Sequence, residues 1–487
     1  MSLFDLLLGI PLLSGVVMAL INRSPIAARL NIAAGFLTFV VALALAFQVL
    51  EQGSILAHEQ AFFLDPYNVF LVSLTAFVAA TTAIFSRTYM LHEEEIGRVT
   101  ASNLRLYHAM FQLFIFGMLL ALTTNNLGVL WIALELATLA TVLLVSLYRT
   151  PAAISAAWKY FILCGVGIAL ALFGTILIFS TSSETLGHGN DALTWTLLYK
   201  NAENLTPQVI TIAFVFLMVG YGTKVGLVPM HAWLPDAHGE GPTPISAVLS
   251  GLLLNVALYA LVRCKTLVDG ATHGDLAGKL MMGFGMLSLV VASMALHRQR
   301  DIKRMYSFSS IEHMGLMTFS FGIGTPLANF AALLHMTVHS LVKSGIFFTV
   351  GHAAQGMKTQ NMIGIRGLIR LQPGIGWGLL LGTIAIAGFP PFGVFASEFL
   401  LMTAALQSYP WTICLLLPSL VVAFAGLFRH VQPMVFGVPP EEVRAVRVNM
   451  LPVYIHLGLA LVLGLAIPGF LADWYHNAAD LLHRGAQ

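Results

Sequence analysis

Apolar residues gather in long runs along this chain, and short polar segments separate the runs. A helix that crosses the hydrocarbon core of a bilayer needs about 20 mostly apolar residues, which is close to the length of these runs. The pattern therefore predicts about fourteen membrane-spanning helices. They cover residues 3–21, 28–48, 65–86, 107–124, 126–148, 154–179, 208–226, 243–263, 279–297, 305–323, 328–352, 376–405, 411–436 and 450–471.

Two polar interruptions stand out against this pattern. Residues 221–251 hold Lys224 among four prolines and several glycines, and residues 388–393 read Gly-Phe-Pro-Pro-Phe-Gly. Irregular backbone at membrane depth must be shielded by protein or must line a wet cavity. An ionisable residue at that depth indicates a functional site. We therefore predict two broken helices, the first of which carries a proton or ion site.

The positions of the two breaks suggest an internal repeat, because transporters often carry one broken helix in each repeat. Lys159 in the sixth predicted helix and Lys343 in the eleventh occupy equivalent positions in the two units. Four parts are predicted: residues 1–106 with the first three helices, 107–265 as the first repeat, 277–436 as the second repeat, and 450–487 as the last helix and tail.

Composition supports a multi-pass membrane protein. The chain is 58% hydrophobic and 9% charged, whereas soluble domains carry about 25% charged residues. Most Lys and Arg residues between the predicted helices fall on one side, which the positive-inside rule makes cytoplasmic, so both termini are expected outside. No basic patch with interleaved aromatic residues indicates nucleic-acid binding. The three cysteines are scattered and form no CxxC motif, so iron–sulfur and structural zinc sites are not expected.

Glu135 lies in the middle of the fifth predicted helix, where an unpaired charge is unfavourable. Lys224 is its natural partner. Moving the two apart would favour release of the lysine's proton, which would couple helix geometry to proton transfer. A fixed structural ion pair is the alternative interpretation.

The eleventh predicted helix carries His335, His339 and Lys343 at positions i, i+4 and i+8, on one helical face. This spacing also fits two ligands of a metal site. However, the sequence has no HExxH motif and no clustered carboxylate to complete such a site. A proton relay is the preferred interpretation, because imidazole titrates near neutral pH. A polar cluster satisfied within the core is the alternative.

Further titratable residues lie beside the breaks. Glu398 follows the second break, where water could reach its carboxylate, or it could be an ordinary group at a helix end. His231 and His238 lie in the first break, and Glu312 and His313 lie in the tenth predicted helix. These four are either gates of a proton path or solvated polar groups.

These residues predict a proton path at mid-membrane depth. The sequence has no P-loop, dinucleotide-binding fingerprint or nucleophile elbow, so we expect a conduit without metal or cofactor rather than a catalyst. The energy must then come from a partner. The predicted path runs through Glu135, Lys224, Lys159, Lys343, His335, His339 and Glu398.

The motif Lys-Val-Gly-Leu-Val-Pro-Met-His-Ala-Trp-Leu-Pro-Asp-Ala-His at 224–238, followed by Gly-Pro-Thr-Pro-Ile-Ser-Ala at 241–247, resembles a known signature. It is similar to that of the proton-conducting, antiporter-like subunits of respiratory complex I, Mrp cation/proton antiporters and group 4 hydrogenases. Within this superfamily, four stretches resemble the hydrogenase-4 component F group: residues 157–169, 306–315, 339–348 and 396–399. The resemblance implies an all-α fold of fourteen helices with two inverted five-helix repeats, each with a broken helix.

The resemblance also implies roles and partners. Glu135 and Lys224 would be the family's paired residues, Lys343 its relay lysine and Glu398 its terminal group. Asn255 departs from the family, several members of which place a lysine or histidine there. The implied protein is a proton-translocating subunit of a redox-driven complex in a bacterial or archaeal cell membrane, with further antiporter-like subunits and a redox module as partners. The alternatives are an Mrp-type antiporter subunit, the membrane partner of an inorganic-carbon uptake system, and a closed scaffold.

Overall fold

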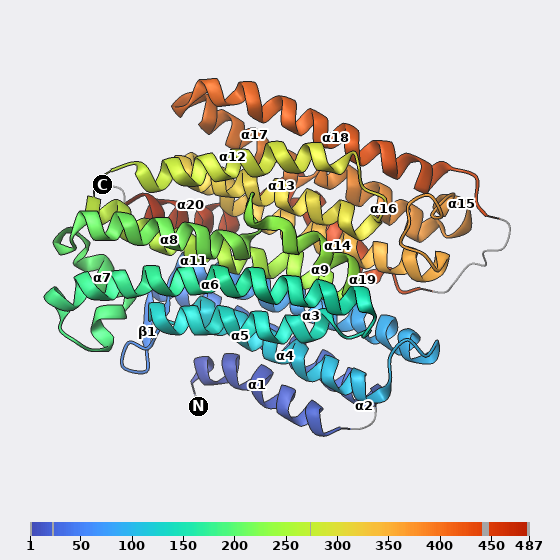
Figure 1. Ribbon diagram of the computed structural model, residues 1–487, viewed down its shortest axis with the longest axis horizontal. Helices are drawn as coiled ribbons and strands as arrows, with labels where there is room; N and C mark the ends of the chain where they lie inside the picture. Colours follow the sequence, from blue (N-terminus) through green and yellow to red (C-terminus); the bar gives the residue numbers. More distant parts are fainter. Residues whose placement is uncertain (1, 22–23, 273, 441–447, 485–487) are drawn as a thin grey trace.

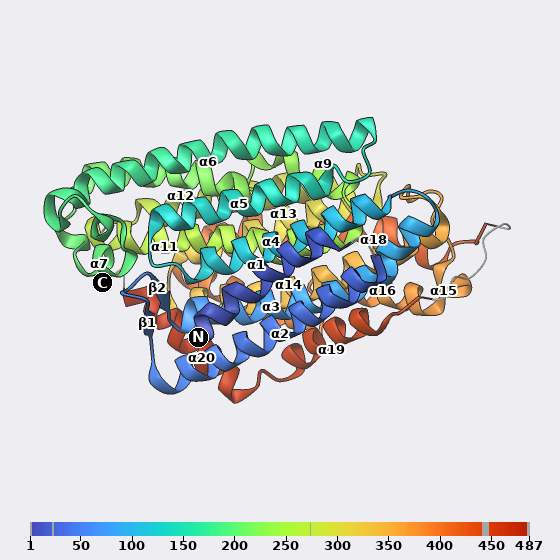
Figure 2. The ribbon, with the colours of Figure 1, turned by 90° about the horizontal axis from the view of Figure 1, so that it is seen from below.

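The computed structural model describes residues 2–21, 24–272, 274–440 and 448–484. Figures 1 and 2 show long helices lying roughly side by side in an elongated bundle, with α6 along one edge in Figure 2. The long helices are α1 (Leu3–Leu20), α2 (Ser24–Gln52), α3 (Pro66–Glu95), α4 (Ala101–Thr123), α5 (Leu127–Val145), α6 (Pro151–Leu186), α8 (Pro207–Val225), α11 (Leu254–Thr272), α12 (Leu276–Leu296), α13 (Ile302–Ile323), α14 (Pro326–Met357), α16 (Pro373–Ile386), α17 (Gly393–Ser408), α18 (Ile413–Phe436), α19 (Leu451–Leu465) and α20 (Gly469–Arg484).

Short elements complete the chain. A hairpin, β1 (Ile55–Ala57) with β2 (Phe62–Leu64), joins α2 to α3, and a short helical segment separates α6 from α8. The hydropathy pattern did not predict either, because the elements in both are far shorter than a membrane span. The segment between α6 and α8 consists of η1 (Asn190–Leu193), α7 (Trp195–Lys200) and η2 (Ala202–Asn204). The remaining short elements are η3 (Met230–Trp233), α9 (Leu234–Glu240), α10 (Thr243–Val248), η4 (Leu249–Leu253), α15 (Leu368–Leu371) and η5 (Pro410–Thr412).

The all-α polytopic fold class is confirmed, and each predicted span coincides with a helix or a broken pair. Within the described ranges, eleven helices are long and apolar enough to cross a membrane, or twelve if α19 and α20, bent by 79°, count as one span. Helix α13 and the pair α16–α17 pack against these spans but fall outside that test. The exact count of fourteen therefore stays a prediction.

Close helix contacts hold the central helices in place. A Cβ on Gly220 of α8 would lie 2.6 Å from the Gly167 oxygen of α6, and one on Gly285 of α12 would lie 2.6 Å from the Gly315 oxygen of α13. Small residues permit such approaches between membrane helices. These contacts hold α8, which carries Lys224, and α13, which carries Glu312 and His313.

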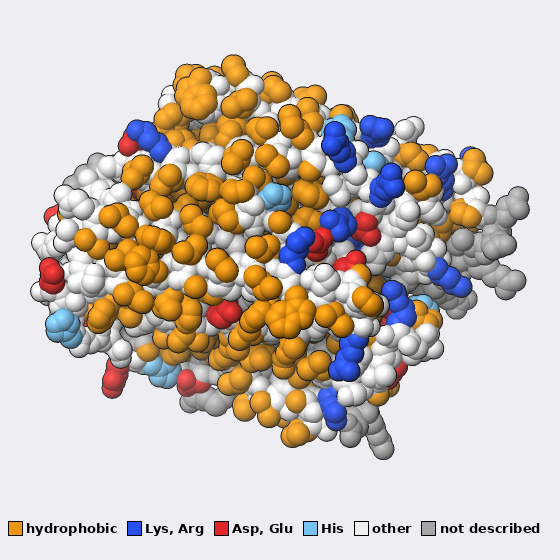
Figure 3. Space-filling model, viewed as in Figure 1, with side chains coloured by type: hydrophobic (Ala, Val, Ile, Leu, Met, Phe, Trp, Pro, Cys, Tyr) orange, Lys and Arg blue, Asp and Glu red, His pale blue; other side chains and the backbone are white. Residues whose placement is uncertain are grey.

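The outer surface matches a bilayer environment. Figure 3 shows hydrophobic side chains covering most of one face, with Lys and Arg gathered towards one end of the long axis. This separation agrees with the loop asymmetry seen in the sequence.

Candidate functional site

The first break follows α8 and is built from residues that end a helix. Gly226 caps α8 in the left-handed region, at φ 83°, and the Val228–Pro229 bond is cis. The freed backbone groups find partners inside the protein. The Val228 N–H donates to Ser288 Oγ at 2.9 Å, and the Trp233 indole donates to the Thr223 oxygen at 2.8 Å. The break is thus shielded by protein, as irregular backbone within a membrane requires.

Glu135 and Lys224 meet between α5 and α8. Lys224 Nζ lies 3.0 Å from Glu135 Oε2, and it also donates to Thr138 Oγ1. The lysine is fully buried, whereas the Glu135 side chain is 20% exposed. If the pair separates, water can hydrogen-bond to the Glu135 carboxylate. Water does not reach Lys224 at its present position.

Lys159 does not lie in the buried line that the sequence predicts. Its side chain is 47% exposed and pairs with Asp236 at 2.5 Å, and Asp236 also pairs with Arg304 at 2.6 Å. Its neighbours on α6, Trp158 and Ile162, are also exposed. In Figure 2, α6 lies at the edge of the bundle. Lys159 is therefore exposed, although its position in the first predicted repeat corresponds to that of buried Lys343 in the second.

The second break resembles the first. Gly388 has φ 68°, and three residues later the Pro390–Pro391 bond is cis, the same spacing as from Gly226 to Pro229. Glu398, on the second turn of α17, folds back onto Gly388 and leaves no room for a Cβ there. The glycine thus permits both the turn and the approach of the carboxylate.

Gly388→Ala is expected to push the Glu398 carboxylate from its place and to slow transport. Part of the effect is backbone strain, about 1–2 kcal/mol for a left-handed residue with a Cβ. Gly53→Ala is the matched control, because Gly53 also has a positive φ, 80°, but an added Cβ there meets nothing within 4 Å. A transport assay with both variants separates strain from displacement. Equal effects would show that the contact with Glu398 is unimportant.

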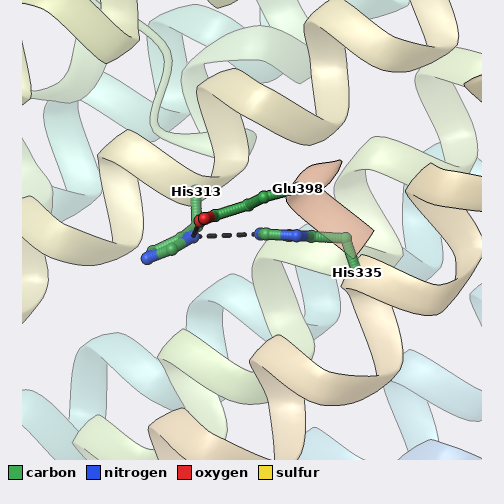
Figure 4. Close-up of side chains that lie close together, drawn as sticks. All are labelled: His313, His335 and Glu398. Carbon is green, nitrogen blue, oxygen red and sulfur yellow. Dashed lines mark hydrogen bonds and ion pairs between the residues drawn. The ribbon is translucent and has the colours of Figure 1, made fainter. Parts of the chain in front are cut away.

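Two histidines and Glu398 form a compact group, which we call the two-histidine cluster (Figure 4). His313 Nδ1 lies 2.9 Å from His335 Nε2 and 4.0 Å from Glu398 Oε1. The residues come from α13, α14 and α17, and all three are buried. The sequence shows no carboxylate clustered with the histidines of α14, and in the structure Glu398 reaches them from a helix distant in sequence.

His339 and Lys343 continue from this cluster along α14. The ring centre of His339 lies 5.6 Å from that of His313, and neither of its nitrogens has a hydrogen-bond partner among the described residues. Lys343 is fully buried and donates to the Tyr306 oxygen at 2.9 Å. The described part of the chain offers it no carboxylate within 4.0 Å. The electrostatic influence of buried Glu312 does reach it.

Asn255 and Ser340 of α14 form a polar contact that the sequence pattern did not predict. Asn255 Nδ2 donates to Ser340 Oγ at 2.8 Å, and Ser340 donates to the Gly251 oxygen at 2.5 Å. Gly251 lies in the π-helical turn η4, and such turns often occur at functional sites. Ser340 and Ser344 lie four residues apart and directly follow His339 and Lys343. This spacing indicates a polar face of α14 and could have been used to predict the contact.

A cavity of about 1170 Å³ opens beside the far end of the first break. Its lining includes Glu93, Arg98, Glu240 and Lys358. Glu93 follows His92 in a stretch that looks like a solvated loop, yet it belongs to α3 and is buried, paired with Arg98 at 3.1 Å.

Lys303 connects this region to the interior. It is fully buried and donates to the Gly241 oxygen at 2.7 Å. Behind it, the buried ring of His238 stacks on Phe347 at 5.0 Å, and the charges of Lys303 and Lys343 both act on that ring. His231, at the other end of the break, is only half-buried. Of the two break histidines, His238 therefore has the buried environment of a relay group.

Two broken helices around a buried row of lysines, histidines and glutamates define a polytopic membrane protein of the antiporter-like class. The chain matches the family described as "NADH:quinone oxidoreductase/Mrp antiporter, TM" over residues 124–424, and it belongs to that family. The resemblance found in the motifs is thereby confirmed.

Individual relatives agree with this assignment. The chain is 46% identical to a "Hydrogenase-4 component F homolog" of Methylacidiphilum infernorum (isolate V4), over 97% of this chain and 98% of that protein. A chain of the archaeal membrane-bound sulfane sulfur reductase has the same fold, with a TM-score of 0.89, 24% identity, and coverage of 99% of this chain and 98% of that one. A chain of the Mrp complex from Dietzia sp. DQ12-45-1b gives a TM-score of 0.87 at 17% identity, with the same coverage.

Proposed function

We propose that this chain moves protons across the membrane as a subunit of a larger redox-driven complex. The observation that supports this function best is the row of buried ionisable side chains that runs from the Glu135–Lys224 pair to Glu398. Lysines and histidines dominate the row, and they carry protons. A sodium site would require a cluster of oxygen ligands such as backbone carbonyls.

The proposed mechanism turns on the charge of Lys224. While Glu135 lies 3.0 Å away, the positive charge is balanced. When the partner complex separates the two, the unbalanced charge acts through a medium of low dielectric constant and repels a proton from Lys343. His339 and the two-histidine cluster pass that proton to Glu398. The contact between Asn255 and Ser340 joins the two halves in place of the titratable residue that several relatives have.

The cavity beside the first break is the proposed proton inlet. Glu93 and Glu240 attract protons into it, and Lys303 and His238 carry them towards Lys343. The cavity is lined by Lys358 and by the last turns of α3 and α14. The other lining residues include Arg98, so the cavity mouth carries basic side chains. We infer that this mouth is cytoplasmic.

Lys303→Met is expected to slow proton uptake about tenfold or more, because a positioned proton-transfer group contributes about 10²–10⁴-fold to rate. Lys358→Met is the matched control: it removes an exposed lysine from the same cavity without touching the buried row. Stopped-flow measurement of proton uptake by vesicles containing the complex compares the two. Uptake by Lys303→Met at the wild-type rate would remove this residue from the inlet.

We infer that the complex lies in a bacterial or archaeal cell membrane, with other antiporter-like subunits and a redox module as partners. The start of α1 and the end of α20 lie towards the same end of the bundle in Figure 1, opposite the basic end in Figure 3. This arrangement supports both termini outside, although residues 1 and 485–487 are outside the described ranges. The four-part division and the two inverted repeats are retained as proposals, supported by the similar glycine-to-proline spacing of the two breaks.

The test of this function is proton transport by the assembled complex. Inside-out vesicles are energised through the redox partner, and a pH-sensitive dye reports acidification with and without sodium. Acidification that needs no sodium supports the proposal. An obligatory sodium requirement, with sodium movement in the opposite direction, would favour an Mrp-type antiporter subunit, and the absence of any proton movement would favour a scaffold.

A further inference from the structure

We propose that the two-histidine cluster binds a divalent transition-metal ion of the Zn²⁺ type and that the bound ion blocks the proton path. The second half of this proposal rests on the proposed function. One donor atom from each of His313, His335 and Glu398 lies within 4.8 Å of the other two. Figure 4 shows the three side chains converging from different helices.

The donor set suits zinc. Two imidazole nitrogens and one carboxylate oxygen are common ligands of Zn²⁺, and they leave a fourth position open. Zinc ligands at about 2.0–2.2 Å in tetrahedral geometry stand about 3.4 Å apart. The observed separation of 2.9 Å between the two ring nitrogens therefore requires only a small ring movement.

The hydrogen bonds around His335 present the correct nitrogen. Ser397 donates its hydroxyl proton to the Val394 oxygen, so its Oγ accepts from His335 Nδ1 at 2.8 Å. In the neutral ring, Nε2 then carries a free lone pair directed towards His313. A partner that fixes the second ring nitrogen is typical of histidines that bind metals.

His313 can adapt to an ion at low energetic cost. Without metal, its Nδ1–H donates to His335 Nε2. Its Nε2 is buried and has no hydrogen-bond partner among the described residues. Moving the ring proton from Nδ1 to Nε2 therefore frees Nδ1 as a ligand, and the bond it loses is replaced by the bond to the ion.

The surrounding charges favour a dication. Glu312 is buried next to His313 and acts electrostatically on Glu398. Burial disfavours the ionised form of both carboxyl groups, and a divalent ion would supply the positive charge that stabilises that form. The opposing charge is that of Lys343, which acts on both Glu312 and His313.

His339 supplies a second, independent indication of a ligand. Both of its ring nitrogens are buried without a partner in the described part of the chain, and its ring centre is 5.6 Å from that of His313. Buried polar atoms usually have a partner. A ring of this kind beside three candidate ligands can complete the coordination directly or through water.

An ion in this position would use the lone pairs that the proton relay needs. With His313, His335 and Glu398 coordinated, no proton can pass from Lys343 to the second break. The Glu135–Lys224 pair, on α5 and α8, would be untouched. Zinc should therefore stop transport without dismantling the first half of the path.

The experiment is a zinc count on the purified complex after equilibration with ZnCl₂ and removal of weakly bound ions. Mass spectrometry gives the number of zinc ions per chain, and X-ray absorption gives their ligands. His335→Asn and Glu398→Gln should each lose one zinc ion per chain. Ser397→Ala keeps all three ligands and should bind zinc about tenfold more weakly, as expected on loss of an orienting partner.

His108→Asn is the matched control, because His108 is also buried with an unpartnered Nδ1 but lies on α4. It should keep the full zinc count. Unchanged zinc in His335→Asn and Glu398→Gln would overturn the site, and transport unaffected by bound zinc would overturn the block. Lys224→Met separates the two proposals: it should keep its zinc although it loses transport. Normal transport by that variant would refute the proposed function and leave the zinc count as a valid test.

Discussion

Lys224→Met is expected to abolish proton translocation by a complex that still assembles. Methionine fills a similar buried volume but carries no charge, so separating α5 from α8 no longer produces the repulsion that acts on Lys343. Translocation should fall at least about tenfold, and up to the 10²–10⁴-fold typical of a lost proton-transfer group. Dye quenching in inside-out vesicles measures the rate, and gel filtration of the solubilised complex checks assembly.

The same substitution should lower thermal stability. Glu135 loses its lysine partner, and leaving a charged acceptor without its donor reduces the free energy of unfolding by about 1–3 kcal/mol. Because Glu135 is partly exposed, water reduces this loss towards the lower value. The control is Lys279→Met, which removes only a surface pair with Asp275 and should change neither quantity. Transport at the wild-type rate by Lys224→Met would contradict the proposed role of the Lys224 charge in the proton path.

The hydropathy pattern was sufficient to predict the long helices and the two breaks at 221–251 and 388–393, but not the 79° bend between α19 and α20. Membrane helices satisfy their own backbone, so their length and composition are visible in a single run of sequence. Gly226 and Gly388, each followed three residues later by a cis-bonded proline, lie where the two interruptions had been placed. The predicted partner of Glu135 was Lys224, and the structure puts the two 3.0 Å apart.

Contacts between distant helices could not be predicted in the same way. Spacing places His335 and His339 on one face of α14, but it does not say which helix faces them. Glu398 approaches because α17 packs against α14 and folds its second turn over Gly388. This approach depends on the path of the chain through the second break, which the spacing of the residues does not encode.

The sequence also did not predict which side of a helix faces the interior of the bundle. Lys159 and Lys343 occupy similar places in the two units, yet one is 47% exposed and the other is fully buried. The difference arises because α6 lies at an edge of the bundle, whereas α14 runs through its interior. Lys303 shows the opposite error: its position among the cations of a loop between two predicted helices indicates an exposed residue, but it is fully buried. In the structure it lies in the first turn of α13, where it donates to the Gly241 oxygen.

Lys343→Met should also abolish translocation, but its effect on stability should be opposite to that of Lys224→Met. Lys343 donates to the Tyr306 oxygen and has no carboxylate within 4.0 Å among the described residues. A fully buried cation without a carboxylate in contact is unfavourable, so an apolar side chain of similar volume should leave the melting temperature unchanged or raise it. Scanning calorimetry of the purified complex and the dye assay measure the two effects.

Lys265→Met provides the matched control for this contrast. Lys265 is buried as well, but it pairs with Asp269 at 2.5 Å, so its removal should lower stability and leave transport intact. If Lys343→Met lowers the melting temperature as much as Lys265→Met does, Lys343 has a counter-ion in the working complex. In that case its proton would be held by a partner, and the charge of Lys224 alone could not drive it towards Glu398. A stable variant without transport is the result that fits a lysine kept unpaired for proton transfer.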